Sequence, residues 1–511
     1  MGLLRSTATV SAMTMVSRVL GFVRDMVIAR VFGAGAGADA FFVAFRIPNF
    51  LRRLFAEGSF SQAFVPVLSE YKTQRSHDEV KKLADDVAGT LGMLLFLITL
   101  AGIIAAPLLI MIFAPGFLDE PHKYDLTVEM LRITFPYILF ISLTAFAGGI
   151  LNSYGRFVVP ALTPVFLNLA MICTALWLAP HMDEPIVALA WGVFIAGVIQ
   201  LLFQLPFLYR LRLLPRPRWA WKQEGVQRIL KLMLPSLFGS SVAQVSLLID
   251  TVIASFLVTG SVSWLYYSDR LVEFPLGVFG VALATVILPS LSLKHAQASS
   301  EGFSHTMDWG LRWVILVGTP AMVGLLVLAG PLLISLFQYG KYGAHDVEMS
   351  SRSLMAYGLG VLAFMLIKVL APGFFARQDT RTPVRIGLIA LGVGLAFKAV
   401  LVLPLAHAGL ALSSSLAAYL NAWLLYRALR REEVYRPEPG WWRLMLQVGF
   451  ANAVMAALLW WGAADWSVWM AWRGSQRIMY LLLLVGAGAA AYFACLWLTG
   501  VRYHHFRQKA K

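Results

Sequence analysis

Long apolar stretches recur along this chain, and they limit its possible folds more than any other feature. A helix needs about 20 consecutive apolar residues to cross the hydrocarbon layer of a bilayer. Fourteen stretches of the 511-residue sequence reach that length. The clearest are 86–114, 130–152, 157–180, 185–208, 310–338, 354–375, 441–462 and 478–500. The others, which contain the intramembrane charges, are 8–32, 37–66, 228–258, 262–292, 384–404 and 409–428. The sequence therefore predicts an all-α polytopic membrane protein with fourteen transmembrane helices.

The overall composition excludes a soluble globular protein. Hydrophobic residues make up 59% of the chain and charged residues only 14%, against about 25% charged residues in soluble domains. No cleavable signal peptide is expected, because Arg18, Arg24 and Asp25 interrupt the first apolar stretch. We attribute the formal net charge of +15 to cytoplasmic loops and contact with anionic headgroups, and predict no nucleic-acid partner.

Lysines and arginines gather in the connections that follow even-numbered predicted helices. They are frequent at 72–82, 210–222, 377–385, 427–436 and 502–511, whereas the connections 181–184 and 259–261 contain none. Cytoplasmic loops of membrane proteins are enriched in these residues. Both termini are therefore predicted to be cytoplasmic.

Two distant segments repeat the same order of motifs. Asp-x-x-Ile-Ala begins at Asp25 and again at Asp250, and a motif centred on proline occurs at Pro66 and again at Pro289. The offsets of 225 and 223 residues span six predicted helices. Because six is even, both copies enter the membrane in the same direction, as in transporters built from parallel repeats.

This repeat predicts two lobes with a substrate site between them. We expect an N-lobe with the first six helices at 1–208, a basic inter-lobe linker at 209–227, a C-lobe with the next six helices at 228–431, and the last two helices with a basic tail at 432–511. The linker contains Trp219 and Trp221 among its basic residues. It is either an interfacial segment with tryptophans at headgroup depth or a solvated loop.

Charged side chains cluster in the first two predicted helices, where lipid makes them costly. A central Arg or Asp costs about 2.5–3.5 kcal/mol on insertion scales, so such residues usually face a bundle interior or an aqueous cavity. Arginines outnumber carboxylates here, and guanidinium groups match phosphate oxygens bidentately, which favours a diphosphate as the missing partner. The predicted substrate-binding residues are Arg18, Arg24, Asp25, Asp39, Arg52 and, from the 262–292 helix, Arg270. Salt bridges between the lobes are the alternative interpretation.

Other charged residues are given supporting roles. Residues predicted to support or gate the cavity are Glu57, Asp269, Glu273 and Lys368, whereas Arg30, Arg46 and Arg53 are expected to be interfacial or structural. An intramembrane lysine needs a counter-charge, and Asp250 is the nearest candidate for Lys398. This pair is either a structural ion pair or a site of protonation or ion coupling.

Motifs of enzymes and nucleotide-binding proteins are missing from the sequence. It contains no H-E-x-x-H, no G-x-x-x-x-G-K-[ST] and no motif around a serine or cysteine nucleophile. Cys173 and Cys495 lie in apolar stretches, as packing residues do. We predict no catalytic residue, no metal site and no cofactor.

A run of longer motifs resembles the MurJ (MviN) family of lipid II flippases. The resemblance covers essentially the whole chain and is most specific in its first two predicted helices. The segments that carry it are 17–25 (SRVLGFVRD), 32–35 (FGAG), 38–45 (ADAFFVAF), 52–58 (RRLFAEG), 60–66 (FSQAFVP), 266–275 (YYSDRLVEFP) and 371–379 (APGFFARQD).

The resemblance implies a fold of the multidrug/oligosaccharidyl-lipid/polysaccharide exporter superfamily, with two six-helix lobes and two further helices that form a groove for a lipid tail. It implies a multi-pass protein of the bacterial cytoplasmic (inner) membrane that flips lipid II, the undecaprenyl-diphosphate-linked disaccharide-pentapeptide, from the inner to the outer leaflet for cell-wall synthesis. The implied mechanism is alternating access driven by the membrane potential or an ion gradient. Arg18, Arg24, Asp39, Arg52 and Arg270 occupy the family's functional positions. Membrane lipids and cell-wall synthesis proteins are further expected partners.

One residue departs from what the resemblance implies. Some relatives bind sodium through a carboxylate on the seventh helix and Asn or Asp side chains on the eleventh. Asp250 fits the first role, but Lys398 stands where a ligand of the eleventh helix would be. Because an ammonium group repels sodium, we expect Lys398 to replace the ion and pair with Asp250.

Three alternatives to a lipid II flippase remain. An exporter of another polyprenyl-diphosphate-linked glycan would use the same cationic cavity. A membrane-embedded cell-wall glycosyltransferase would need a catalytic carboxylate in a large extracytoplasmic loop, and no loop here is long enough. A scaffold within the cell-wall machinery would not explain the buried arginines.

Overall fold

The structure, a computed structural model, describes residues 2–53, 60–463 and 465–501. Nearly all of this part of the chain is helical, and it contains no strand. This confirms the predicted all-α class. The chain divides into two compact units, Met1–Ser263 and Trp264–Lys511. This division does not test the lobe boundaries predicted at 208 and 228, which stay a prediction.

The first unit contains the helices up to the beginning of α11. They are α1 (Gly2–Phe32), α2 (Ala36–Arg52), α3 (Phe60–Gln74), α4 (His77–Ile104), α5 (Ala106–Phe113), η2 (Pro115–Asp119), α6 (Pro121–Thr134), α7 (Tyr137–Ser153), α8 (Val158–Cys173), η3 (Thr174–Leu178), η4 (Ala179–His181), α9 (Val187–Arg210), α10 (Glu224–Ser255) and α11 (Ser261–Pro275). Local signals set several of these boundaries. Gly33 ends α1 with φ of 72°, a value that glycine adopts readily, and Ser76 with Glu79 forms a capping box at the start of α4.

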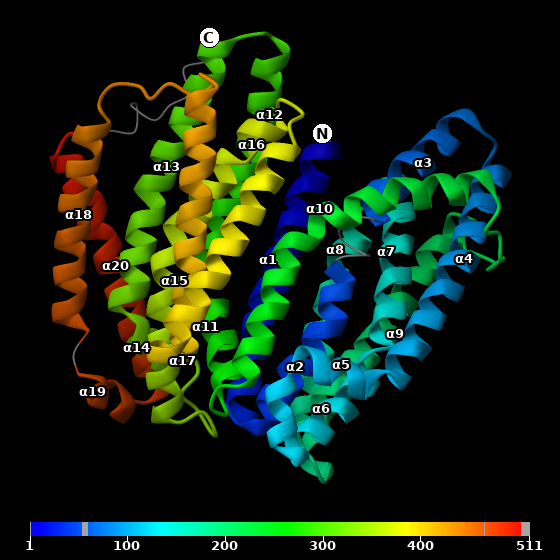
Figure 1. The fold of residues 1–511 in the computed structure, drawn as a ribbon, viewed down its shortest axis with the longest axis horizontal. Helices are drawn as coiled ribbons and strands as arrows, with labels where there is room; N and C mark the ends of the chain where they lie inside the picture. The colour runs from blue at the N-terminus through cyan, green and yellow to red at the C-terminus, as the bar shows by residue number, and fades with distance from the viewer. Residues whose placement is uncertain (1, 54–59, 464, 502–511) are drawn as a thin grey trace. The chain divides into compact units, whose positions relative to one another are not determined.

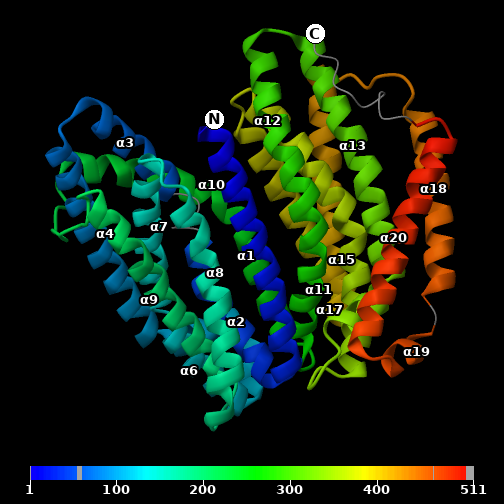
Figure 2. The same ribbon diagram turned by 180° about the vertical axis from the view of Figure 1, so that it is seen from behind.

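Within the first unit, α1 packs along α8, and α9 packs against both α7 and α8 (Figure 2). The shorter α2 packs on α6, and α10 contacts α3 and α4. Aromatic rings fill the centre of one cluster, where Phe64 lies 5.1 Å from both Phe60 and Phe146, measured between ring centroids. This packing fixes the faces of α1 and α2 that bury charge.

The second unit contains the rest of α11 and the helices after it. They are η5 (Leu276–Gly280), α12 (Val281–Ala296), α13 (Ser300–Val327), α14 (Ala329–Leu336), α15 (Ala344–Leu370), α16 (Pro372–Phe375), α17 (Arg381–Arg431), α18 (Trp441–Gly462), α19 (Trp466–Ala471) and α20 (Gly474–Leu498). Here α15 packs against both α13 and α17. The last two long helices, α18 and α20, pack on each other and against α13 and α14 (Figure 1).

The helices are consistent with the predicted membrane stretches, and the exact number of fourteen stays a prediction. Ten helices of the described residues are long and apolar enough to span a bilayer. One of them, the 51-residue α17, is interrupted at Ala406, where φ is 48° and ψ is −127°, so it comprises the two predicted helices 384–404 and 409–428. The stretches 8–32, 37–66 and 228–258 fall on α1, on α2 with α3, and on α10, apart from residues 54–59, which are not described.

Candidate functional site

Arg24 and Asp25 form a buried charged centre on α1. Arg24 is 8% exposed and Asp25 is 1% exposed. The Arg24 Nε and Nη2 atoms donate to the same carboxylate oxygen of Asp25 at 2.9 and 2.7 Å. The Nη1 atom donates to the side-chain oxygen of Asn168 on α8 at 3.0 Å. Asn168 in turn donates from Nδ2 to the carbonyl oxygen of Ser17 at 3.0 Å, which ties it to α1.

Two other predicted substrate arginines in the first unit are more accessible. Arg18 is exposed on α1. Arg52, at the end of α2, is half-buried, and its Nε donates to the Asn49 side chain at 2.9 Å. Their roles in binding substrate stay predictions.

Asp39 lies at the start of α2 and is fully buried, and its partners are protein groups. Its carboxylate accepts from the backbone N–H groups of Gly260 and Ser263 at 2.7 and 2.9 Å and from the Ser263 hydroxyl at 2.6 Å. The Lys123 ammonium lies 3.5 Å away. These amides belong to the N-terminal turn of α11, where a negative charge is stabilising. Asp39 therefore acts as an N-terminal cap of α11 supplied by another helix, and its predicted contact with substrate stays a prediction.

The residues predicted to be structural include one that links two helices. Arg46 of α2 donates from Nη1 to the hydroxyl of Thr251 on α10 at 2.7 Å. Arg30 is exposed at the end of α1. Glu57, predicted to support or gate the cavity, lies outside the described residues.

In the second unit, Arg270 is paired within its own helix. Its Nη1 lies 2.6 Å from Glu273 Oε2, and its guanidinium lies 4.7 Å from the centroid of the Tyr266 ring. Asp269 is the neighbouring carboxylate on α11, and Lys368 is exposed on α15. Arg270 and Glu273 are thus one turn apart, as the sequence predicts, and the pair leaves Arg270 partly exposed.

Asp250 and Lys398 are both buried, at 8% and 3% exposure. Asp250 belongs to the first unit and Lys398 to the second. Their pairing, and any part in ion coupling, therefore stay predictions. The described residues contain no group of three or more His, Cys, Asp or Glu side chains that could hold a metal ion.

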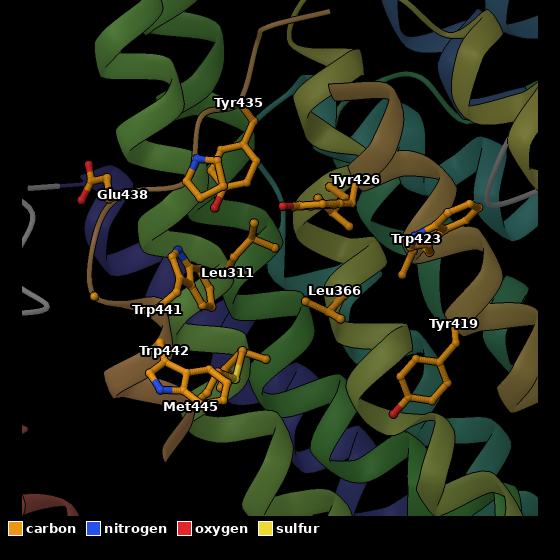
Figure 3. Close-up of a pocket in the computed structure, with 15 residues that line it drawn as sticks. Leu311, Leu366, Tyr419, Trp423, Tyr426, Tyr435, Glu438, Trp441, Trp442 and Met445 are labelled. Carbon is orange, nitrogen blue, oxygen red and sulfur yellow. The ribbon is translucent and has the colours of Figure 1, made fainter. Parts of the chain in front are cut away.

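A largely apolar pocket of about 710 Å³ lies in the second unit. Figure 3 shows Trp441, Trp442 and Met445 on one side and Tyr419 and Trp423 on the other. Leu311 and Leu366 form the wall between them. Aromatic and aliphatic side chains dominate this lining, so the pocket suits an apolar chain.

Asp308, on α13, holds one end of this pocket together. It is 1% exposed, and its Oδ1 accepts from the Tyr435 hydroxyl and the Trp441 indole N–H, both at 2.7 Å. Its Oδ2 accepts from Arg312 Nε at 2.6 Å. Burial, together with the hydrogen bond to Asp308, raises the pKa of Tyr435 far above its ordinary value. Tyr435 therefore remains a neutral donor, and two aromatic rings of the pocket are fixed by one carboxylate.

Arg477 is a second buried arginine, near the start of α20, and is 7% exposed. It donates to four backbone carbonyl oxygens, those of Trp469 and Met470 at 2.9 and 2.7 Å, and those of Ile334 and Gln338 at 3.3 and 3.0 Å. These carbonyls lie at or just beyond the C-terminal ends of α14 and α19, where a positive charge is favourable. Arg477 therefore joins three helices.

The comparisons with known proteins assign the chain to a family. The family model described as "Lipid II flippase MurJ" matches residues 28–479, which is most of the sequence. The chain belongs to this MurJ family. A Vibrio cholerae protein named "Probable lipid II flippase MurJ" is 51% identical over 98% of this chain and 97% of its own length. A Burkholderia cenocepacia protein named "Lipid II flippase MurJ" is 46% identical, with the whole of both chains covered.

Solved structures agree with the MurJ assignment. A structure titled "Lipid II flippase MurJ, inward closed conformation" matches with a TM-score of 0.81 at 25% identity, covering 96% of this chain and 98% of that one. A MATE family transporter of the MOP superfamily matches with a TM-score of 0.69 at 13% identity, covering 84% and 98%, which shows a shared fold. Membership of a flippase family confirms the prediction of a transporter rather than an enzyme.

Several residues that organise this MurJ family member are not evident from its sequence. Asn168 is a lone amide in an apolar stretch, and Lys123 resembles a loop lysine because it lies between predicted helices. Asp308 and Arg477 lie just outside predicted apolar stretches. For Asn168, the one available signal is the cost of a polar group in lipid.

Proposed function

We propose that this protein flips lipid II from the inner to the outer leaflet of the bacterial cytoplasmic membrane by alternating access, for cell-wall synthesis. The observation that supports this most is the buried Arg24–Asp25–Asn168 centre within a chain that belongs to the MurJ family over most of its length. Lipid II has a diphosphate between its sugar and its lipid, so a flippase must pass two phosphates through a region that excludes charge.

Arg24 is the proposed primary contact for the diphosphate. Its guanidinium is held by two side chains, Asp25 and Asn168, and side chains can rotate away when a stronger partner arrives. A phosphate offers two oxygens to one guanidinium, which is a charge-assisted and bidentate arrangement. Arg18 and Arg52 are proposed as additional phosphate contacts on α1 and α2, and Arg270 as a contact supplied by α11.

The aromatic pocket of the second unit is the proposed place for part of the undecaprenyl tail. Its volume of about 710 Å³ and its Trp, Tyr and Leu lining fit an isoprenoid chain better than a sugar. The two C-terminal helices that the resemblance assigns to a lipid-tail groove include α18, which supplies Trp441, Trp442 and Met445.

Direction and energy source complete the proposal. Both termini are proposed to be cytoplasmic, because Lys and Arg are concentrated in the connections on that side. The membrane potential or an ion gradient is proposed to drive the cycle, with Asp250 and Lys398 as the candidate groups for coupling. Cell-wall synthesis proteins remain proposed partners.

A leaflet-accessibility assay for lipid II tests this function. Cells depleted of the protein would be complemented with the wild type, Arg24→Ala or Arg270→Ala, after membrane abundance has been matched. We expect lipid II to accumulate in the inner leaflet with Arg24→Ala and, to a smaller extent, with Arg270→Ala. Normal translocation by both variants would contradict the proposed cationic site.

A further inference from the structure

The connection between α9 and α10 lies against α4. The backbone N–H of Arg216 donates to the Asp85 carboxylate at 2.7 Å, and that of Arg218 donates to the Asp85 carbonyl oxygen at 3.1 Å. Five residues further along α4, the hydroxyl of Thr90 accepts from the N–H of Ala220 at 3.2 Å. The Asp85 carboxylate also pairs with Lys81. Backbone groups of the linker are therefore bonded to α4, and the side chains of its later part are left exposed: Arg216, Arg218, Trp219, Trp221 and Lys222.

Gly89 makes this close approach possible. A Cβ atom at position 89 would overlap the backbone N, C and O atoms of Arg218, whereas a Cβ atom at Gly92, on the same helix, would meet no atom within 4 Å. At the beginning of the linker, Leu213 is fully buried in the core of the first unit. The linker is thus attached to the unit at several points along its length.

The outward side of the linker is basic and aromatic. Residues 211–223 contain four cations and no Asp or Glu: Arg212, Arg216, Arg218 and Lys222, all exposed. None of the four makes an ion pair with another described residue, although the charge of buried Asp86 acts on Arg218. Trp219 and Trp221 are 60% and 41% exposed, and their rings stack with centroids 6.1 Å apart.

The linker is also at the depth where lipid headgroups are expected. Asp85 and Thr90 lie at the beginning of the apolar stretch 86–114, and α4 presents an exposed apolar stripe that starts at Met93 and continues through Phe96, Leu97 and Leu100. Thr90 and Met93 are three residues apart, which is about 4.5 Å along a helix. The tryptophans are therefore close to the end of the surface that faces lipid, where Trp is enriched in membrane proteins.

We propose that the linker 211–223 is a docking surface for anionic phospholipid headgroups of the leaflet at this end of α4. Its four unpaired cations provide charge complementarity, and clusters of Lys and Arg next to the membrane attract anionic lipid. The stacked tryptophans insert at headgroup depth, and the bonds to α4 hold the cations in place before a lipid arrives. This inference does not depend on which substrate the protein moves.

A charge-neutralising variant tests recognition of the headgroup. Full-length protein would be placed in nanodiscs of phosphatidylcholine with about one third phosphatidylglycerol, and the lipids it retains would be counted by native mass spectrometry. We expect Arg216→Gln/Arg218→Gln/Lys222→Gln to lower the ratio of retained phosphatidylglycerol to phosphatidylcholine at least about twofold. The matched control, Arg132→Gln/Lys341→Gln/Arg473→Gln, removes three exposed cations that lie outside the basic connections assigned to the cytoplasmic side, and it should retain the wild-type ratio.

A second pair of variants tests the position of the linker without changing its charge. Gly89→Ala should displace the linker from α4, whereas Gly92→Ala should leave it in place. The signal is the fluorescence of Trp219 and Trp221, obtained as the difference between each protein and the same protein with Trp219→Phe/Trp221→Phe. In nanodiscs that contain phosphatidylglycerol, we expect protection from acrylamide for the wild type and Gly92→Ala, and a loss of protection for Gly89→Ala.

Two results would overturn the docking surface. The first is an equal ratio of retained lipids for the linker variant and its control. The second is acrylamide quenching of the two tryptophans that is the same in phosphatidylcholine alone as in the mixture, which would identify a solvated loop or a contact indifferent to headgroup charge.

Discussion

Arg24 and Arg477 are buried to nearly the same extent, at 8% and 7% exposure, but they are held by different kinds of partner. Arg24 is bonded to the side chains of Asp25 and Asn168. Arg477 is bonded to four backbone carbonyls at the ends of two helices. A side chain can exchange one partner for another by rotating about its own bonds, whereas a backbone carbonyl keeps its position as long as its helix stays packed. Burial of an arginine in this protein therefore does not define its role, and the nature of its partners does.

The largest expected effect comes from the exchangeable arginine. Arg24→Ala should reduce lipid II translocation at least about tenfold, because it removes a charge-assisted bidentate contact made during transport. Its thermal unfolding temperature should also fall, because Arg24→Ala leaves the buried Asp25 carboxylate without the Arg24 counter-charge. Arg24→Lys keeps the positive charge and loses the bidentate contact, so it should melt near the wild type and still lose translocation. The leaflet-accessibility assay measures the first quantity and a melting curve in detergent the second. An Arg24→Lys variant that melts far below the wild type would assign Arg24 to the structural class.

The fixed arginine should behave in the opposite way. Arg477→Ala removes the guanidinium donor from four carbonyls at or just beyond the ends of α14 and α19, of which, among the described residues, only that of Trp469 keeps a backbone donor, the N–H of Trp472. Each unsatisfied buried group costs about 1–3 kcal/mol. We expect a loss of at least about 3 kcal/mol in stability and a clear drop in Tm. Arg477→Lys should recover only part of it, because an ammonium group cannot reach carbonyls in the planar arrangement of a guanidinium. If Arg477→Ala melted like the wild type but transported less lipid II, Arg477 would be a functional arginine and not a structural one.

Asp308 extends the comparison to a carboxylate. Its two oxygens accept from Tyr435, Trp441 and Arg312, so it belongs with Arg477 as a structural group. Asp308→Asn should cost about 2 kcal/mol of stability, since an amide loses the charged bond to Arg312. Circular dichroism melting measures this cost. The conservative variant Tyr435→Phe, which removes one donor, should cost about half as much.

Asn168 offers a finer test of how Arg24 is held. Asn168→Ala removes the bond to Arg24 Nη1, which is worth about 1.5–3 kcal/mol because its donor is charged, and should lower translocation several-fold while the Arg24–Asp25 pair persists. Asn168→Asp would place a second carboxylate against the same guanidinium and should also lower translocation, by holding Arg24 more tightly. An increase in translocation by Asn168→Asp would contradict the interpretation of Arg24 as a group that exchanges its partners.

The smallest effect is expected at Asp379, in the connection between α16 and α17. Hydrogen bonds from the Thr382 side chain and backbone lower the pKa of the Asp379 carboxyl below its ordinary value. A lowered pKa means that the ionised group stabilises the folded state above the unfolded pKa of about 3.9, and that this contribution is lost as the pH falls through the folded pKa. Asp379→Asn should therefore cost about 0.5 kcal/mol at neutral pH and nothing in strong acid. Unfolding measured across this range checks the sign.

The sequence contains most of the fold because apolar length alone locates the helices. It also places Arg24 beside Asp25, since neighbouring residues of one helix need no tertiary information. The sequence does not identify Asn168 as a partner of Arg24, because this contact joins residues 144 positions apart. The same limit applies to Asp39, whose donors Gly260 and Ser263, at the start of α11, are 221 and 224 positions away. From the sequence, the linker is either an interfacial segment or a solvated loop. The sequence does not decide between them, because Gly89 allows the backbone of Arg218, from a distant part of the chain, to pack against α4.

The tight turn at Ala406 has a consequence for biogenesis. Residues 402–410, which join the two halves of α17, contain no Lys, Arg, Asp or Glu. In the proposed orientation this turn is the part that crosses the bilayer during synthesis, and no formal charge has to be moved with it. The two halves of α17 can therefore enter the membrane together as one helical hairpin. A single lysine introduced at this turn would raise the free-energy barrier to membrane insertion of both halves.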